Sequence, residues 1–230
     1  MPLRDDPMLH TPHLDSQYEQ ELTAISTAVT RMCDQAERMV RDSVLALLSR
    51  DESLGKQILA ADESLDQAET EIDALCVRLM ARRAPVGRDL RMITATLKLV
   101  ADIERIGDLA GNIVKRGIQI DPVLGMPEEV SDLAKGVVEE LGLAFRALRQ
   151  RDATLARRLR AEDKGTDDRN RAAFDRLIRL GQGSPQALEP MLALTNVCRH
   201  LERIGDHAVN IAEMVVYMVD GKVIRHCADD

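Results

Sequence analysis

The chain has 230 residues, a formal net charge of −8 and an aromatic content of 2%. Sheets draw on aromatic and β-branched residues, whereas the Leu, Ala, Arg, Glu and Asp that dominate here favour helices, so the composition predicts an all-α protein. The negative charge excludes a general nucleic-acid binder, because phosphate contacts require clustered Lys and Arg.

The cysteines and the apolar runs indicate the cellular compartment of the protein. The four cysteines are scattered and form no C-x-x-C pair, which is typical of reduced thiols in a cytoplasmic protein. Residues 1–16 lack the apolar segment of a secretory signal, and the longest apolar run near the other end, 214–219, is too short to span a bilayer. We therefore expect a cytoplasmic protein without direct membrane insertion.

The first predicted helix carries an apolar stripe in which spacings of four and three alternate, as in a helix that packs along one seam. The members of the stripe are Tyr18, Leu22, Ile25, Val29, Met32, Ala36 and Met39. We interpret the stripe as core. A turn near 49–51 follows, in which Asp51 is placed to cap a second helix that runs to about Arg82.

The next elements follow from breakers in the sequence. The segment 83–89 contains a proline and a glycine and interrupts the helical pattern. Asp89 is a candidate cap for a third helix, predicted from Leu90 to about Ile118. Residues 121–127 include two prolines and a glycine, which predicts a linker.

The second half of the chain repeats this plan. A fourth helix is predicted over 128–150, and Asp152 is placed to cap a fifth helix that continues unbroken to Gly181. Ser184 followed by Pro185 is a strong start signal for a sixth helix, which ends near Gly221.

The repeat is also visible in the residues themselves. Several residues of 50–66 recur 101 positions later, and Ile103–Asp108 recurs 98 positions later as Leu201–Asp206. We therefore predict two tandem three-helix bundles of long helices. The predicted boundaries are a flexible tail at 1–12, a first repeat at 13–121, a linker at 122–127 and a second repeat at 128–230.

Each repeat carries a ladder of oxygen ligands on its third helix, because residues four apart share one helical face. The ladders are Glu104, Asp108 and Asn112 in the first repeat and Glu202, Asp206 and Asn210 in the second. Acidic residues on the preceding helices are the expected companions. They are Asp62, Asp66 and Glu69 in the first repeat and Asp163 and Asp167 in the second, where Asn170 stands in place of Glu69.

Two ladders on adjacent helices would form a cluster of hard oxygen ligands, so we predict a metal site in each repeat. The candidate metals are iron, manganese, magnesium or zinc. The alternative is a solvated acidic surface paired with Arg105 and Arg203. Gly107 and Gly205, inside their helices, indicate either close approach of a backbone or bound ions, or tight helix packing.

Nothing in the sequence resembles an assembled nucleophile and base. The chain has no P-loop, G-x-S-x-G, H-E-x-x-H or E-x-x-H pattern. His200 and His207 flank the second ladder, have no counterpart in the first and are interpreted as incidental. We predict a protein that is not an enzyme.

The doubled E-R-I-G-D-x-x-x-N motif and the segment Pro85–Arg91 resemble the PhoU family, accessory proteins of the phosphate-specific transport system. Gly87 stands where the family usually has Ala. The resemblance extends from about Leu14 to the C-terminus. It implies two tandem three-helix bundles, metal clusters held by the carboxylates named above, and homodimers. It also implies negative regulation that links the phosphate ABC transporter, through its ATPase subunit, to a phosphate-sensing histidine kinase.

Two other functions remain open from the residues. One is a metal-dependent hydrolase or oxidase that uses the carboxylate clusters directly, because all-oxygen metal clusters activate water. The other is a helical scaffold without metal, in which the acidic ladders are solvated surface.

Overall fold

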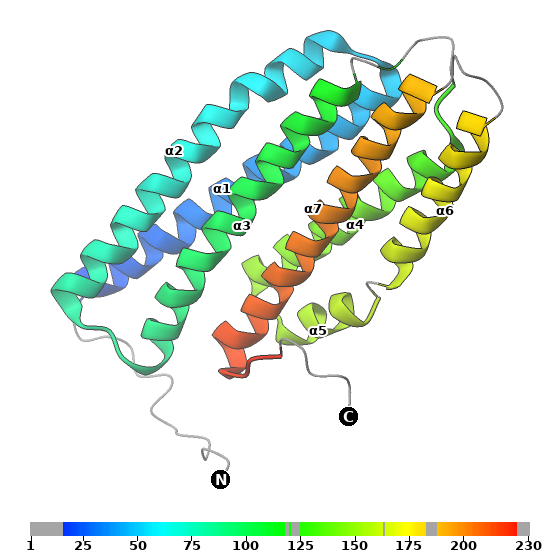
Figure 1. Cartoon of the computed structure of the whole chain (residues 1–230). Helices are drawn as coiled ribbons and strands as arrows, with labels where there is room; N and C mark the ends of the chain where they lie inside the picture. Colours follow the sequence, from blue (N-terminus) through cyan, green and yellow to red (C-terminus); the bar gives the residue numbers. More distant parts are fainter. Residues whose placement is uncertain (1–15, 118–119, 121–124, 163, 183–187, 225–230) are drawn as a thin grey trace.

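The described part of the protein is a bundle of seven helices (Figure 1). The computed structural model describes residues 16–117, 120, 125–162, 164–182 and 188–224, and these residues contain no strand. The helices are α1 (Ser16–Ser49), α2 (Glu52–Arg83), α3 (Gly87–Gly117), α4 (Glu128–Gln150), α5 (Ala153–Glu162), α6 (Lys164–Gln182) and α7 (Leu188–Asp220). They form two tandem units, α1–α3 and α4–α7, which confirms the predicted all-α fold.

Some sequence predictions fall outside the described residues. They are the N-terminal tail at 1–12, residues 122–124 of the linker at 122–127, Asp163, the start of the last helix at Ser184-Pro185 and the predicted end of the third helix at Ile118. Within the described part, α7 begins at Leu188 and α4 spans the predicted 128–150.

The apolar stripe of α1 forms core, as predicted. Every member from Leu22 to Met39 is buried, whereas Tyr18 at the start of the helix is half-buried. The Tyr18 hydroxyl donates a hydrogen bond to Asp89 Oδ2 over 2.9 Å. Burial and this bond to a carboxylate both raise the pKa of Tyr18 far above its ordinary value. The bond ties the start of α1 to the start of α3.

The first turn of each unit has the same construction. Arg50 and Arg151 both adopt positive φ, at 59° and 52°, and each is followed by an aspartate that caps the next helix. Asp51 Oδ1 accepts from the Leu54 amide at 3.0 Å, and Asp152 Oδ1 accepts from the Leu155 amide at 2.9 Å. Both predicted caps are therefore confirmed, because each aspartate satisfies an amide that has no partner within the helix.

The turn between α2 and α3 differs from the prediction. Ala84 closes α2 with a φ of 44°, and α3 begins at Gly87 rather than Leu90. Gly87 has a φ of 56°, which a glycine adopts without steric cost. Asp89 therefore lies within the first turn of α3 and accepts from Tyr18, so the predicted cap at this residue is wrong.

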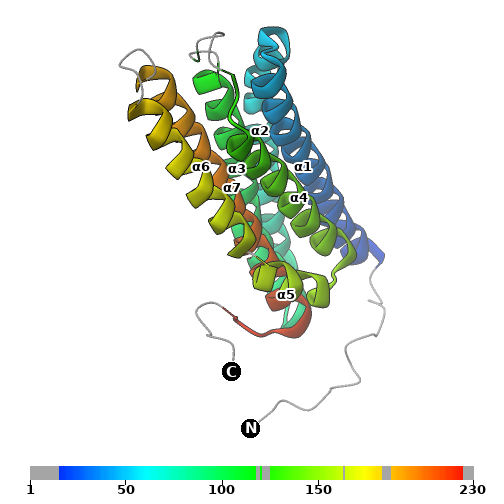
Figure 2. The same cartoon turned by 90° about the vertical axis from the view of Figure 1, so that its right-hand side faces the viewer.

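The segment predicted as one helix after Asp152 contains two helices in the described part. The structure has α5 up to Glu162 and α6 from Lys164, whereas the equivalent α2 of the first unit is unbroken. Gly165 and Thr166 follow the division, and both residue types are weak helix formers. α5 lies across one end of the second unit (Figure 2).

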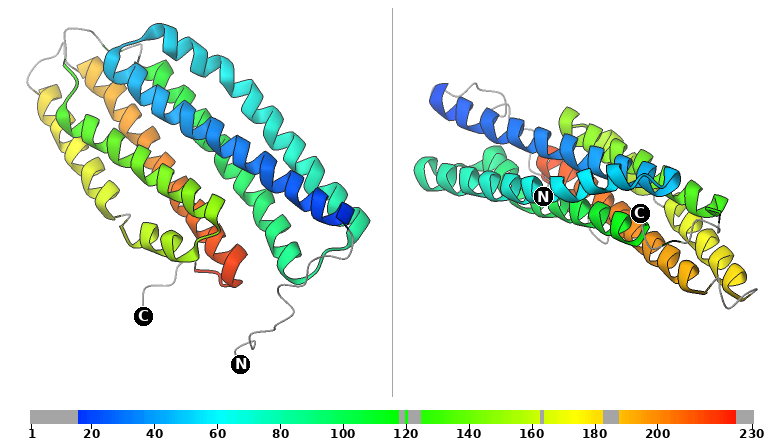
Figure 3. Two further views of the ribbon diagram at one scale, coloured as in Figure 1. Left: turned by 180° about the vertical axis from the view of Figure 1, so that it is seen from behind. Right: turned by 90° about the horizontal axis from the view of Figure 1, so that it is seen from above.

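The two units pack through α3 and α7, which run in opposite directions at the centre of the molecule (Figures 1 and 3). His207 Nδ1 on α7 lies 2.8 Å from Asp102 Oδ1 on α3, and Asn210 donates to the same oxygen at 3.5 Å. On another face, Arg149 of α4 pairs with Asp34 and Glu37 of α1, at 2.6 and 3.0 Å. His207 is thus a contact between the units, although its sequence context indicated an incidental residue.

The helices of the described part are amphipathic rather than uniformly apolar. None of them combines the length and the hydropathy that a membrane-spanning helix requires. Their buried faces meet in one continuous core that is shared by both units.

Candidate metal centre

The carboxylates predicted for the first unit come together between α2 and α3. Burial is the largest cause that raises the pKa of Asp62 on α2 above its ordinary value, and the negative charge of Asp108 on α3 is the next. Asp66, one turn from Asp62, adds to this effect. The pKa of Glu69 is also raised, by burial and then by Asp73, Asp66 and Asp108. The two ladders therefore face each other.

Glu104 is the most strongly perturbed member of this cluster. Its pKa is raised from 4.5 to about 7, first by burial and then by the charge of Asp108, with smaller contributions from Glu69 and Asp66. Arg105 opposes this rise, with its Nε 3.5 Å from Glu104 Oε2 and its Nη1 3.1 Å from Asp108 Oδ2. Because Arg105 is largely exposed, solvent weakens this compensation. The cluster keeps an excess of negative charge.

Gly107 brings α2 and α3 close enough for the two ladders to meet. A Cβ at this position would lie 2.2 Å from Leu65 Cδ2 and 3.6 Å from Met39 Cε. Leu65 and Met39 are both buried, so the space is filled by core side chains. Of the two explanations for this glycine, the structure supports tight helix packing.

The donor set fits a hard cation. Asp62, Asp66, Glu69, Glu104 and Asp108 offer only carboxylate oxygens, the ligands preferred by Mg²⁺, Mn²⁺ and oxidised iron. With the side chains as they stand, no three Asp, Glu, His or Cys residues of the described chain converge on one metal position. Metal binding would therefore require the five carboxylates to turn toward a common point.

The carboxylates of the second unit are arranged differently. Asp163 lies outside the described residues, and Asp167 on α6 and Asp206 on α7 are both exposed. The pKa of Asp206 is raised, chiefly by partial burial, while His207 lowers it and Asp167 raises it. Asp167 and Asp206 are thus close enough to interact, with Glu202 one turn from Asp206 on α7.

Two buried polar residues of the second unit were missed by the sequence analysis. Thr166 donates a 2.6 Å hydrogen bond to Glu140 Oε2, and both residues lie next to Gly205. Glu140 and Thr166 follow Met39 and Leu65 by 101 positions, the interval of the repeat. An acidic residue aligned with a core methionine was the signal that could have revealed them.

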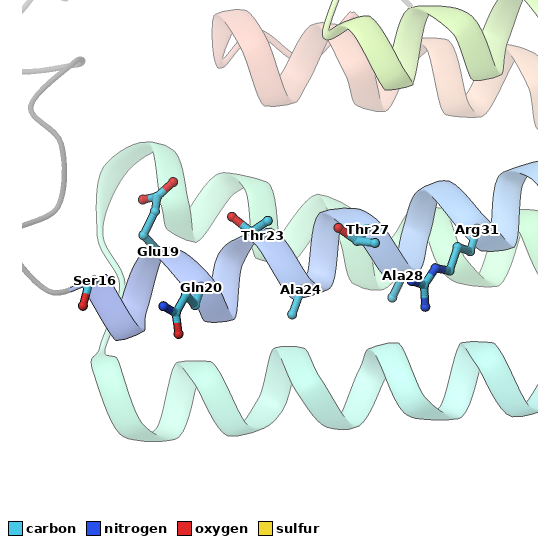
Figure 4. Close-up of a pocket in the computed structure, with 8 residues that line it drawn as sticks. All are labelled: Ser16, Glu19, Gln20, Thr23, Ala24, Thr27, Ala28 and Arg31. Carbon is cyan, nitrogen blue, oxygen red and sulfur yellow. The ribbon is translucent and has the colours of Figure 1, made fainter.

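A hollow on the surface lies elsewhere. It is a shallow depression of about 680 Å³ along the first half of α1, between Ser16 and Arg31 (Figure 4). Glu19, Thr23 and Thr27 line it, together with other residues of the same helix. None of the candidate metal ligands contributes to this hollow.

Comparison with known proteins identifies the family. The family model described as the PhoU domain matches residues 29–117 and 130–215, one stretch in each unit. The phosphate-specific transport system accessory protein PhoU homolog of Pseudomonas aeruginosa is 36% identical over 219 residues, covering 94% of this chain and 90% of that relative. The PhoU protein of Escherichia coli K12 is 30% identical over 220 residues, covering 95% and 91%.

Solved structures agree in fold. The crystal structure of PhoU from Pseudomonas aeruginosa superposes with a TM-score of 0.85 and covers 90% of this chain and all of that one, at 36% identity. The phosphate transport system regulatory protein PhoU from Streptococcus pneumoniae has a TM-score of 0.84 at 24% identity, covering 90% and 99%. With both units matched by the family model and by a relative along 90% of its length, this chain belongs to the PhoU family.

Proposed function

We infer that this chain is a regulatory accessory protein of phosphate uptake and not an enzyme. The family model matches both units, and relatives at 30% identity or more are named as accessory proteins of the phosphate-specific transport system. In this proposal the protein acts in the cytoplasm as a homodimer. It represses the phosphate-starvation response by linking the ATPase subunit of the phosphate ABC transporter to a phosphate-sensing histidine kinase.

The proposal includes a metal ion held by the first unit. One observation carries it: carboxylates from α2 and α3 face one another, and burial, followed by repulsion from Asp108, Glu69 and Asp66, raises the pKa of Glu104 to about 7. A bound cation removes such repulsion and keeps the carboxylates ionised. The metal would stabilise the α2–α3 face that a partner recognises. A corresponding site in the second unit would use Asp163, Asp167, Glu202 and Asp206.

Elemental analysis of protein purified without affinity resin tests the metal. We expect stoichiometric metal in the wild type and its loss in Glu104→Gln/Asp108→Asn, which keeps the side-chain shapes. The matched control is Glu63→Gln/Glu71→Gln, which removes two exposed carboxylates from α2. Glu202→Gln/Asp206→Asn reports on the second unit alone. Absence of metal from the wild type at cellular metal concentrations would contradict the proposal.

A reporter of phosphate-starvation genes tests the regulatory role. Deleting this protein should turn the reporter on at high phosphate, and the wild-type chain should restore repression. Glu104→Gln/Asp108→Asn should fail to restore it at normal protein levels, whereas the Glu63→Gln/Glu71→Gln control should succeed. Full repression by the metal-free variant would separate regulation from metal binding. Turnover of a phosphate ester that disappears with the same variant would instead favour a hydrolase.

A further inference from the structure

One end of the bundle presents exposed apolar side chains. The turn between α2 and α3 carries Val86, whose side chain is 78% exposed, and the end of α7 leads into Val223, which is 62% exposed. Leu90 and Val219 on the same two helices are also exposed. We call this surface, formed by residues 82–91 and 219–224, the α2–α3/α7 end. Soluble surfaces seldom expose several large apolar residues together without a binding role.

The two segments lie side by side. Arg91 of α3 packs against Gly221, where a Cβ would be 3.5 Å from the arginine Nε. The register agrees, because α3 and α7 are antiparallel and meet where His207 contacts Asp102. Leu90 and Val219 each lie twelve residues from that contact and so at one level along the helices. Figures 1 and 3 show the turn and the end of α7 at the same end of the molecule.

Positive charge surrounds these apolar residues, although the chain as a whole carries −8. The end contains five basic residues, Arg82, Arg83, Arg88, Arg91 and Lys222, against two acidic ones, Asp89 and Asp220. Asp89 accepts from Tyr18 and Asp220 pairs with Arg157 of α5, while Arg82 and Arg83 both pair with Glu21 of α1. Arg88, Arg91 and Lys222 make no ion pair with any other residue that the structure describes.

We propose that the α2–α3/α7 end docks on the surface of an anionic phospholipid bilayer. Valine side chains at a protruding turn enter the interfacial layer, while Arg and Lys beside them attract lipid phosphates. A helix of a partner protein would instead need a groove, and this end is built from a turn and a helix terminus. The contact is peripheral, and it does not depend on the metal or on the regulatory partners proposed above.

Co-sedimentation of the full chain with vesicles tests the docking. We expect binding to vesicles that contain phosphatidylglycerol, little binding to pure phosphatidylcholine, and weakening as salt rises. Val86→Asp/Val223→Asp should lower the partition coefficient at least about tenfold. The matched control, Leu188→Asp/Leu192→Asp, changes two residues that are 55% and 57% exposed beside Glu189 at the start of α7, and it should bind like the wild type.

The contribution of charge has its own pair of variants. Arg88→Glu/Lys222→Glu should abolish most of the binding, whereas Arg38→Glu/Arg41→Glu, which makes the same charge change on exposed α1 positions, should retain it. Helicity by circular dichroism verifies that each variant is folded. The proposal would be overturned if test and control variants lost vesicle binding equally, or if the wild type did not bind anionic vesicles. If the same variants lost only co-purification with the transporter ATPase subunit, the end would be a protein interface.

Discussion

The two units share a helix plan and an E-R-I-G-D motif but differ in what lies against the motif glycine. In the first unit Gly107 packs on Leu65 and Met39, which are apolar and buried. In the second, Gly205 faces Thr166 and Glu140, which are joined by a hydrogen bond. A polar pair has thus replaced an apolar pair at equivalent positions, within one and the same fold.

The two units also differ in the charges that surround their acidic ladders. In the described part of the first unit, Lys115 compensates the charge of Asp62 and Arg105 that of Glu104. The second contains further internal pairing, with Arg160 Nε of α5 lying 3.5 Å from Glu213 Oε1 of α7. Glu213 and Arg160 align with Lys115 and Leu59 of the first unit. A repeated motif therefore does not ensure a repeated metal site, because the residues that surround the motif determine the electrostatic environment of its carboxylates.

The largest expected effect comes from the residues that pack against the glycines. Leu65→Ala removes a fully buried side chain and should lower the free energy of unfolding by about 2–5 kcal/mol. Thr166→Val keeps the side-chain volume but removes the hydrogen bond to Glu140, and it should lower the free energy of unfolding by about 1–3 kcal/mol. Urea denaturation of both variants measures the difference. A larger loss for the threonine variant would show that polar contacts dominate the second unit.

Alanine at Gly107 and alanine at Gly205 should change the free energy of unfolding in opposite directions. At Gly107 the new methyl group would lie 2.2 Å from Leu65, and the overpacking should cost about 1–3 kcal/mol. At Gly205 the nearest atoms are at 3.5 Å, so Ala should stabilise α7 by up to about 1 kcal/mol through its higher helix propensity. Thermal unfolding monitored by circular dichroism distinguishes the two. The same sign for both variants would refute the proposed difference in packing.

A smaller effect is expected at the contact between the units. Arg149 binds both Asp34 and Glu37 on α1, so Arg149→Ala should destabilise the protein by about 1 kcal/mol. Arg171→Ala is the control, because Arg171 pairs with Asp168 on the exposed surface of one helix and should contribute almost nothing. Denaturation curves of the two variants test this. Indistinguishable curves would mean that the Arg149 contact does not stabilise the interface.

The smallest effect concerns Glu104 and depends on pH. Its pKa in the folded protein, about 7, lies above its ordinary value of 4.5, so ionisation destabilises the metal-free protein as pH rises through this range. Glu104→Gln should therefore raise Tm by about 2–4 °C at pH 8 and leave it unchanged at pH 4, measured after chelation. When metal is added, the wild type should have the higher Tm of the two. An equal rise for Glu202→Gln would indicate similar crowding in the second unit.

Much of the fold was predictable from local chemistry. The alternating stripe of α1, the caps at Asp51 and Asp152 and the bounds of α4 depend on residues close together in the chain. The division between α5 and α6 and the start of α3 at Gly87 were not predicted. Gly165 and Thr166 are weak helix formers within an otherwise helical pattern, and Gly87 starts α3 with a positive φ inside a segment that breaks the pattern.

The candidate site was predicted in part. The spacing of Glu104 and Asp108 gives one helical face from sequence alone, and the repeat points to companions such as Asp62. Gly107 has no side chain, so Leu65 of α2 packs directly against α3 and the two helices lie close together. This close packing buries Glu104, and burial is the largest cause of its raised pKa. Sequence spacing contains no information on the distance between the two helices.

By itself, then, the sequence determined the helical class, the repetition of the helix plan and the family to which the motif belongs. These follow from periodicity and from residues within a few turns of one another, where side-chain geometry is fixed by the helix. Only the tertiary structure decided that Asp102 meets His207, that Glu140 is buried beside Gly205 and that Arg91 packs against Gly221 at the end of α7. Contacts between distant segments arise from the balance of packing and desolvation over the whole core, which no local pattern encodes.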